Sequence, residues 1–495
     1  MLNPCKYIFI LAATLLCAGP IAAQQIRYNV EAASTFANDD THPTWHIHNR
    51  QGLSGETAQY GYMRAGLSGS HTIGEELTLD WGADLVAGDN LTSAMYIQQA
   101  FVDINWKKLT FSLGQKERWG ELKNHRLSTG ALVESGNARP IPQIRIEAPE
   151  YFDFFKTNGW FTIRGHLAYG WFTDGEWQKR WVADGKGHST GVRYHSKAIF
   201  FKAGKENRFP LTYEFGLQMT AQFGGAMYNV YNVTGDYLHN PSRIKDYFMI
   251  LVPLSGDNQY SDFDQGNVAG NHLGSWHTAV TWHSDKWKMR AYYEHLFDDH
   301  SQMFMEYGLW TEQLVGLELT LKDCRWIKAV AVEYFNLKKQ GGPVYHDTTN
   351  EIPDQVSCRD DNYNHQRYNG WFNYGIVMGS PLVTSPLHNS NHTLTCYNNR
   401  VEAFHIGIEG EPFTSLGYRV LLTHSNNWGT YKTPFTDIKS NTAGLVEITC
   451  KPRQMKGWSV TASYAFDNGS LMGNNRSAML TIGNCGFINL KSKKK

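Results

Sequence analysis

The chain lacks a long apolar run anywhere beyond its first 23 residues. A membrane-spanning helix needs about eighteen or more consecutive apolar residues, and no later stretch approaches that length. An excess of either charge is also missing, because 46 basic residues balance 46 acidic residues. Without a basic footprint, the composition excludes nucleic acid as a partner. If the mature protein resides in a membrane, it crosses the bilayer as strands.

Cysteine is scarce, and the sequence motifs of enzyme chemistry are absent. Two of the seven cysteines fall within the first 23 residues, and the wide spacing of the others shows no zinc pattern and allows at most two disulfides. Neither HExxH nor G-x-S-x-G occurs. We therefore predict no catalytic residue, no metal and no cofactor. The later cysteines are Cys324, Cys358, Cys396, Cys450 and Cys485. The histidine pairs His46 with His48 and His283 with His295 are interpreted as strand residues that face water or an interface rather than as metal ligands.

The first 23 residues have the pattern of a secretory signal peptide. Lys6 precedes the apolar run 7–18, and a Gly-Pro break with small residues follows up to Ala23, after which we predict cleavage. A lipoprotein signal through Cys17 is the alternative, disfavoured because a leucine rather than a small residue precedes it. The predicted organisation is a signal peptide at 1–23, one barrel domain with plug and long loops at 24–490, and a basic tail at 491–495.

What the chain has in abundance is alternation of apolar and polar residues with the period of two that a β-strand requires. In LTLDWGADLV, apolar residues occupy every second position from Leu77 to Leu85, and Thr, Asp and Gly lie between them. We find about seventeen such runs and, because barrels of this class have even strand numbers, predict eighteen strands with one run missed. The runs lie near 25–36, 60–71, 77–86, 95–105, 108–116, 158–173, 187–202, 213–224, 275–283, 287–297, 313–322, 325–337, 400–410, 417–426, 440–451, 458–467 and 475–488.

The polar faces of these runs distinguish a membrane barrel from a soluble all-β protein. A soluble sandwich exposes many lysines and glutamates, whereas the polar faces here carry mainly Gly, Ser, Thr, Ala and Asp. Trp and Tyr recur at strand ends, where they would form the interfacial girdles of a lipid-embedded barrel. We predict an all-β fold, a transmembrane outer-membrane β-barrel of about eighteen antiparallel strands. A periplasmic all-β protein is the alternative.

Residues outside the strands gather in four blocks. A barrel of about sixteen or more strands encloses water unless something fills it. The stretch SGNARPIPQIRI (135–146) lies in the first block, and because Pro140 and Pro142 cannot donate to a ladder, we predict that it lies outside any strand and fills the lumen. DYFMILVPL (246–254) is predicted as a helix or turn packed in or below the barrel. The blocks are 117–157, 225–274, 298–312 and 338–399.

Six stretches of the chain are distinctive. They are GQKERWGELKNHRLSTGALVESGNARPIPQIRIEAPEYFDF (114–154), GNHLGSWH (270–277), YYEHLFDDHSQMFMEYGLW (292–310), DNYNHQRYNGWFNYGIVMGSPL (361–382), NNRVEAFHIGIEG (398–410) and THSNNWGTY (423–431). In order and spacing they resemble the Wzi family of capsule assembly proteins, in its Bacteroides-type outer-membrane form, over nearly all of the mature chain.

The resemblance implies an eighteen-stranded outer-membrane barrel with a closed lumen. It also implies a non-catalytic, lectin-like function that binds, retains or organises capsular or related polysaccharide at the cell surface, with outer-membrane lipid as a second partner. The role would be either anchoring or assistance to the capsule export machinery. The C-terminus departs from the usual pattern, because Phe487 and Ile488 precede a polar lysine tail rather than ending the chain. A porin-like channel for oligosaccharides and an outer-membrane hydrolase are the alternative functions.

Two blocks carry the side chains that a polysaccharide site needs. Aromatic faces contact sugar rings, amides and carboxylates bond hydroxyl groups, and arginine also pairs with uronate carboxylates. For the first block the alternative is structural, in that its charges pair with wall residues such as Asp80 and Asp84 and hold a plug. For the second block the alternative is a self-packed surface loop. The candidates are Trp119, Asn124, Arg126, Asn137, Arg139, Gln143, Arg145 and Glu147 in the first block, and Asp361, Arg367, Tyr368, Trp371 and Tyr374 in the second.

Overall fold

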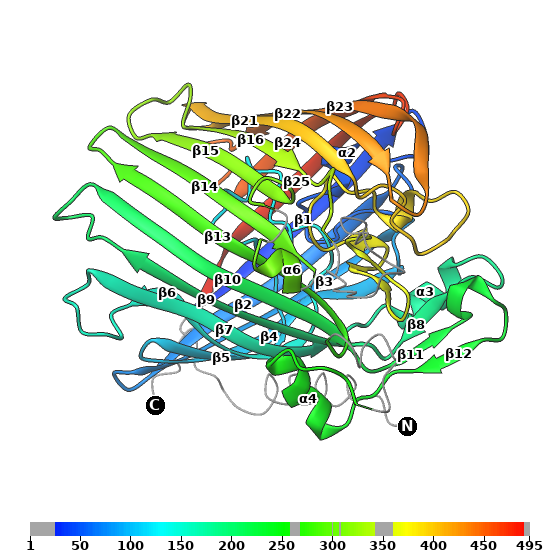
Figure 1. The fold of residues 1–495 in the computed structure, drawn as a ribbon. Helices are drawn as coiled ribbons and strands as arrows, with labels where there is room; N and C mark the ends of the chain where they lie inside the picture. Colours follow the sequence, from blue (N-terminus) through cyan, green and yellow to red (C-terminus); the bar gives the residue numbers. More distant parts are fainter. Residues whose placement is uncertain (1–24, 258–267, 299, 306–307, 342–359, 490–495) are drawn as a thin grey trace, which may run out of the picture.

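Eighteen antiparallel strands close into one barrel in the computed structural model, which describes residues 25–257, 268–298, 300–305, 308–341 and 360–489 (Figure 1). Each strand pairs with its neighbours along the chain, and β1 closes the sheet on β25 through a register that runs from Gln25↔Asn489 to Ala37↔Ser477. The predicted outer-membrane β-barrel fold is confirmed. The wall strands are β1 (Gln25–Ala37), β2 (Gly61–Ile73), β3 (Leu77–Asp89), β4 (Met95–Trp106), β5 (Leu109–Gln115), β6 (Gln143–Phe152), β7 (Phe161–Trp171), β9 (Arg193–Ala203), β10 (Leu211–Phe223), β13 (Asn271–His283), β14 (Trp287–Phe297), β15 (Gln313–Leu321), β16 (Ala329–Asn336), β21 (Val401–Phe413), β22 (Leu416–Gly429), β23 (Pro434–Cys450), β24 (Trp458–Gly469) and β25 (Arg476–Asn489).

Helix is rare, and the remaining strands are short. Within the described residues, no helix is long and apolar enough to cross a bilayer. The smaller elements are α2 (Thr44–Ile47), α3 (Gly175–Trp181), α4 (Ile244–Leu251), α6 (His300–Met303), η1 (Val230–Asn232), η2 (Pro386–His388), β8 (His188–Thr190), β11 (Ala226–Tyr228), β12 (Tyr237–His239), β17 (Asn364–His365), β18 (Asn369–Gly370), β19 (Phe372–Asn373) and β20 (Ile376–Val377).

The strand missing from the predicted set is β6, which begins inside the proline-rich stretch. Residues 135–142 lie outside any strand as predicted, but Gln143 to Ile146 enter the wall and pair with β5, so the prediction for these four residues was wrong. The two prolines come just before the strand, where no ladder bond is needed. Pro149 coincides with a register shift against β7, the kind of irregularity that tolerates proline.

The two faces of the barrel wall explain the regular alternation of apolar and polar residues in the sequence. Leu85, Leu317 and Ile482 are among the outward apolar side chains that remain exposed, whereas the inward side chains contact the plug or the lumen. At the end with the short turns, large aromatic side chains are exposed on or beside the wall strands, as the interfacial girdle of a membrane barrel requires. They are Trp106, Phe154, Phe155, Trp160, Phe209, Trp282, Trp326, Phe413 and Trp458.

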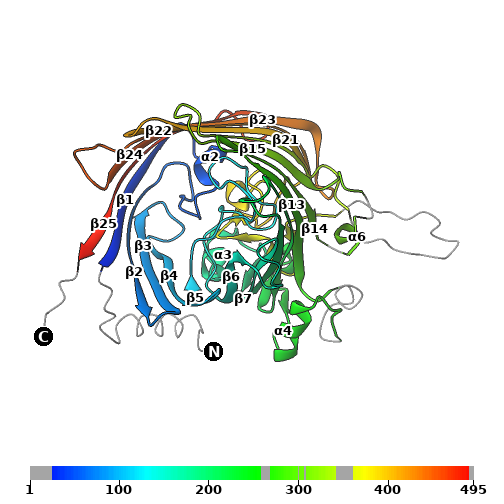
Figure 2. The ribbon, with the colours of Figure 1, turned by 90° about the vertical axis from the view of Figure 1, so that its left-hand side faces the viewer.

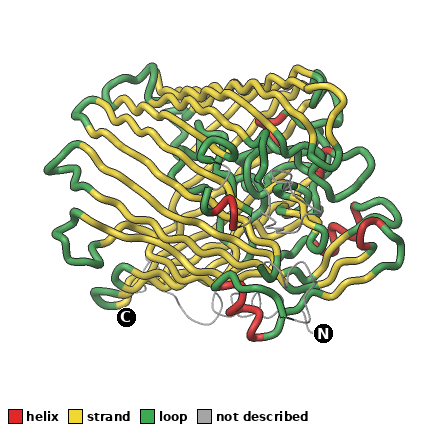
Figure 3. Tube along the Cα trace, in the orientation of Figure 1, coloured by secondary structure: helices red, strands yellow, loops and turns green. Residues whose placement is uncertain are grey.

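The two ends of the barrel differ in their connections. The described end of β25 and the start of β1 lie at one end, together with short turns such as 74–76 and 414–415. The long segments all lie at the other end, where loops and short elements crowd the mouth (Figure 3). We call these the short-turn end and the long-loop end. The predicted signal peptide, its cleavage after Ala23 and the predicted basic tail at 491–495 lie outside the described residues and stay predictions.

A plug fills the long-loop half of the lumen, as Figure 2 shows from the short-turn end. It is formed by residues 38–60, 116–142 and 361–400, whose apolar side chains share one core with wall residues such as Leu314 and Phe335. Ser135 donates its backbone N–H to the Met378 carbonyl at 2.8 Å and joins two of the three segments. On β21, a Cβ at Gly407 would lie 2.5 Å from the Leu127 carbonyl oxygen, so glycine permits the close approach of plug to wall.

The apolar stretch 246–254 does form a helix, α4, but its predicted place in or below the barrel was wrong. Figures 1 and 2 both place α4 against the outside of the wall near the long-loop end. The four described later cysteines, Cys324, Cys396, Cys450 and Cys485, are unpaired. Cys358 lies outside the described residues.

Candidate functional site

Buried ion pairs hold the first plug segment, residues 116–142, to the wall. Lys123 and Glu294 of β14 form a pair at 2.9 Å whose side chains are 2% and 0% exposed. Glu294 also accepts the backbone N–H of Leu132 at 2.9 Å, and Glu121 pairs with Arg164 of β7 at 2.7 Å. These contacts agree with the structural alternative for the first block, in which its charged residues pair with wall residues and hold a plug in place. The wall acids involved differ from those predicted.

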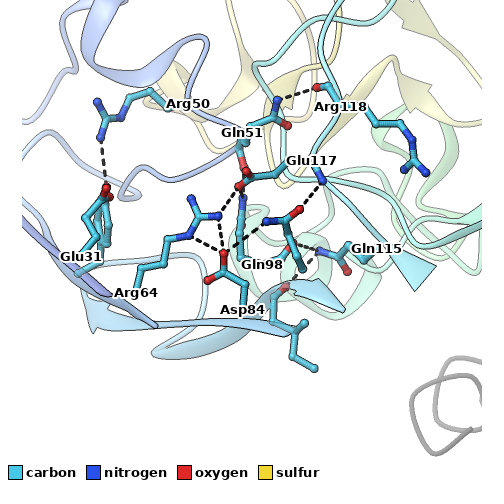
Figure 4. Close-up of polar contacts among 12 residues, drawn as sticks. Glu31, Arg50, Gln51, Arg64, Asp84, Gln98, Gln115, Glu117 and Arg118 are labelled. Atoms are coloured by element: carbon cyan, nitrogen blue, oxygen red, sulfur yellow. Dashed lines mark hydrogen bonds and ion pairs between the residues drawn. The ribbon is translucent and has the colours of Figure 1, made fainter. Parts of the chain in front are cut away.

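The predicted wall partner Asp84 acts through an intermediary (Figure 4). Arg64 of β2 bonds Asp84 of the wall and reaches Glu117 of the plug at 3.0 Å. Gln98 donates to both the Glu117 carboxylate and the Gln51 carbonyl, which ties the plug segments 38–60 and 116–142 together. Asp80, the other predicted partner, accepts from Asn105 of the neighbouring strand instead.

Three first-block candidates lie on the side of the plug that faces the short-turn end. Arg126 pairs with Glu409 at 2.6 Å, near the short-turn end of β21, and Asn124 donates to Glu318 at 3.3 Å. Trp119 is 41% exposed, and its ring lies 4.8 Å from that of His125. The structure therefore brings these three together on one accessible surface.

The next candidates are held by protein contacts. Asn137 is buried and donates to the Gly379 carbonyl at 2.7 Å. Arg139 lies between two aromatic rings, 3.5 Å from the centroid of Tyr96 and 3.9 Å from that of Tyr374. Such stacking stabilises the guanidinium without an acidic partner. These residues fasten the first plug segment to the wall and to the segment 361–400.

A cavity of about 80 Å³ lies between part of the first plug segment and the wall. Arg118, Arg139 and Arg145 line it, and desolvation beside Arg145 lowers the pKa of Arg118 to about 10, which leaves it charged at neutral pH. Arg145 bonds Glu147 at 2.5 Å. The buried amide oxygens of Gln143 and Gln218, also on this lining, have no hydrogen-bond partner among the described residues. The lining thus has four basic side chains, including Lys116, against two carboxylates, Glu121 and Glu134, and it has spare hydrogen-bond acceptors.

The second block is part of the plug rather than a surface loop. Trp371 is 1% exposed and donates its indole N–H to the Val133 carbonyl at 2.7 Å, and Tyr368 is also buried. Tyr374 donates its hydroxyl to the Thr173 carbonyl at 3.1 Å. Asp361 pairs with Lys432 at 3.2 Å, and Arg367 donates to Asn240 at 2.8 Å. All five candidates of this block are thus engaged with other parts of the chain.

Below the plug, the lumen contains a second, larger cavity of about 720 Å³, which we call the vestibule. Arg27, Ser68, Asp80, Asp103 and Lys116 line it. Lys116 pairs with Asp103 at 2.5 Å and also lines the smaller cavity, so the two spaces adjoin at this side chain. The plug separates the vestibule from the long-loop end.

An aromatic platform that the sequence did not reveal lies at the long-loop end. The small sheet of β8, β11 and β12 projects beyond the barrel (Figure 1), and it brings His188, Tyr228 and Tyr237 together. The His188 and Tyr228 rings stack at 5.1 Å, and Tyr237 lies 5.1 Å from Tyr228. Tyr237 is 56% exposed, and neither tyrosine hydroxyl bonds a described residue. The one sequence feature that could have indicated this platform is the turn-rich segment between Tyr228 and Tyr237, which is typical of a short hairpin.

Three histidines cluster where the plug segments 38–60 and 361–400 meet. The His42 and His388 ring centroids lie 6.2 Å apart, and those of His48 and His388 lie 6.5 Å apart. Burial lowers the pKa of His42 to about 3 and that of His388 to about 4, and holds the pKa of His48 well below its ordinary value. Across the part of the chain that is described, no three His, Cys, Asp or Glu residues form a metal-binding group.

Acidification is expected to weaken the plug. Because the folded-state pKa values of these histidines lie below the unfolded value of about 6.5, the unfolded chain binds more protons between pH 6.5 and 4. The plug is then fully stable above pH 6.5 and loses about 1 kcal/mol per histidine for each pH unit below it. Denaturant midpoints followed by tryptophan fluorescence at pH 7.5 and 5 measure this. His388→Gln should reduce the pH dependence, and an unchanged dependence would contradict the assignment.

The chain matches no protein-family model and none of the curated proteins. Among solved structures it is similar to Wzi of Escherichia coli, described as an outer membrane protein involved in group 1 capsule assembly and as a carbohydrate-binding β-barrel. The TM-score is 0.56 with 11% identity, over 97% of this chain and 88% of that chain. OccD3 of Pseudomonas aeruginosa is also similar, with a TM-score of 0.47 and 9% identity over 94% and 91% of the two chains. At such identities, the likeness to Wzi establishes the outer-membrane barrel fold and leaves the function open.

Proposed function

We propose that this outer-membrane barrel binds surface polysaccharide and retains it at the cell surface, without chemical turnover. The observation that carries the proposal is the aromatic platform of His188, Tyr228 and Tyr237, displayed at the long-loop end above a plugged lumen. Long loops of outer-membrane barrels face the exterior, so the platform would meet the capsule. The description of Wzi as a carbohydrate-binding β-barrel supports the same class of ligand.

Aromatic rings suit sugar rings for an electrostatic reason. The ring face carries partial negative charge, which attracts the polarised C–H groups on one side of a pyranose. The two tyrosine hydroxyl groups, which bond no described residue, can add hydrogen bonds at the edge of the platform. Stacked rings are already ordered, so little conformational freedom is lost on binding.

The plug argues against the alternative of a porin-like channel. Its apolar core is continuous with wall residues, and the fully buried pair of Lys123 and Glu294 joins the plug to the wall inside the lumen. An oligosaccharide channel would instead need a continuous polar passage. Transport through this barrel would therefore require the plug to detach.

Among the candidates predicted from the sequence, Trp119, Asn124 and Arg126 offer a second contact for polysaccharide. They lie on the side of the plug that faces the short-turn end, and Trp119 also lines the smaller cavity with Arg139 and Arg145. We assign them to a chain segment that reaches the barrel from the short-turn end. The buried candidates Asn137, Tyr368 and Trp371 would act only by holding the plug in place.

Removing the platform should weaken binding of capsular polysaccharide from the same strain. Tyr228→Ala and Tyr237→Ala are each expected to raise the Kd about tenfold, because an aromatic hot spot contributes about 1–2 kcal/mol. Titration of the detergent-purified protein measures the Kd, and retention of the heat-resistant fold is the control. Trp119→Ala should leave this binding within about twofold if the platform dominates. Loss confined to Trp119→Ala would move the site to the side of the plug that faces the short-turn end. Absence of binding by every form would refute the function.

A further inference from the structure

The helix α4 lies on the outer surface of the barrel, against the wall formed by β7, β9 and β10 (Figure 2). The Tyr169 hydroxyl donates to the backbone carbonyl of Tyr247 in α4 at 2.7 Å. The ring centroids of Tyr247 and Phe223 lie 5.0 Å apart. Ile250 is fully buried with Ala221 and Phe223. Tyr169, Ala221 and Phe223 alternate with lumen-facing neighbours such as Gln218 and Gln222, so the helix covers the outward face of these strands.

Polar wall residues lie beneath this helix. Lys197 points outward from β9 and donates to the carbonyl of Ile250 at 3.3 Å and to that of Leu251. A lysine at the last carbonyls of a helix satisfies groups that otherwise lack partners and complements the helix dipole. The buried His195 and His272 flank the same region of the wall. Without α4, these polar groups would face lipid.

The other face of α4 is apolar and uncovered. Ile244 is 81% exposed and Phe248, four residues later, is 66% exposed, so both lie on one side of the helix. Val252 and Leu254 extend this exposed surface beyond the last turn. The charged residues gather at the first turn, where Arg243 pairs with Asp246 at 2.7 Å.

We propose that the outward face of α4, comprising Ile244, Phe248, Val252 and Leu254, lies in the outer leaflet of the membrane and contacts lipid acyl chains. The face continues the exposed apolar wall, because Ile199 of β9, two residues from Lys197, is exposed to the same side. Interfacial helices with one apolar face lie in this way at the boundary between headgroups and acyl chains. The inference rests on the barrel fold and is independent of polysaccharide binding.

The position of Phe248 can be measured with a single fluorinated probe. In lipid vesicles, 4-trifluoromethylphenylalanine at residue 248 should show strong fluorine relaxation by dissolved oxygen, which concentrates in lipid, and little by a water-soluble gadolinium chelate. The same probe at Phe215, exposed on the wall, supplies the lipid reference, and at Tyr237 on the platform it supplies the water reference. We expect the oxygen-to-gadolinium ratio at residue 248 to match that at residue 215 and to exceed that at residue 237 several-fold. A ratio equal to that at residue 237 would overturn the proposal.

Discussion

Lys123→Met should raise the ion conductance of the barrel above that of the wild type. The substitution leaves Glu294 fully buried with no cation within ion-pair distance among the described residues, other than a histidine at 3.7 Å. Breaking a buried ion pair by removing one partner costs about 3–5 kcal/mol, because the remaining charge is uncompensated. This pair is one of several contacts that hold the first plug segment, with Glu121–Arg164 and the shared apolar core, so its loss should loosen the segment and raise the fraction of time for which it is displaced. Ion conductance in a planar bilayer measures this displacement.

The double variant Lys123→Met with Glu294→Gln is the matched control. A glutamine can still accept the backbone N–H of Leu132, which the Glu294 carboxylate bonds at 2.9 Å, but it carries no charge. The double variant should therefore regain most of the lost plug stability and remain nearly silent in the bilayer. Equal conductance in wild type and Lys123→Met would show that the pair does not hold the plug.

Trp371→Ala should be the most destabilising single truncation in the second block. The side chain is almost fully buried, packs against Phe172 and Tyr194, and donates to the Val133 carbonyl. Truncating a buried tryptophan to alanine costs about 3–5 kcal/mol through the lost contacts and the cavity left behind. Denaturant unfolding followed by fluorescence of the remaining tryptophans measures the change in free energy.

Trp119→Ala provides the comparison, because Trp119 is 41% exposed whereas Trp371 is 1% exposed. Its truncation should change the free energy of unfolding by less than about 1 kcal/mol. The same stability loss in both variants would mean that burial does not distinguish the two tryptophans. A stable Trp371→Ala with weakened polysaccharide binding would restore Trp371 as a direct contact.

The wall could be predicted because its signal is local. Each outward position must be apolar and each inward one is free to be polar, so alternation such as that of Leu77 to Leu85 marks a strand within ten residues. The strand β6 escaped detection because its register is interrupted at Pro149 and it directly follows two prolines. Local proline content masked a strand that pairing with β5 and β7 stabilises.

The presence of a plug could be predicted from the sequence, but its contacts with the wall could not. The sequence indicated that polar residues of 117–157 fill the lumen, but pairs such as Lys123 with Glu294 join residues far apart in the chain, and no spacing identifies them. Composition could not show that Trp371 and Tyr368 are buried, since an aromatic segment rich in asparagine looks the same in a sugar-binding loop and in a plug. The platform went unrecognised because His188, Tyr228 and Tyr237 come from three short strands.

Single-channel recording of the wild-type protein tests the central claim most directly, because that claim is a closed barrel that binds polysaccharide at its surface. The protein, reconstituted in a planar bilayer at neutral pH, should show no steady open channel, with or without added capsular polysaccharide. Stable wild-type channels that added oligosaccharide blocks from the vestibule side would contradict the account and assign the barrel to transport.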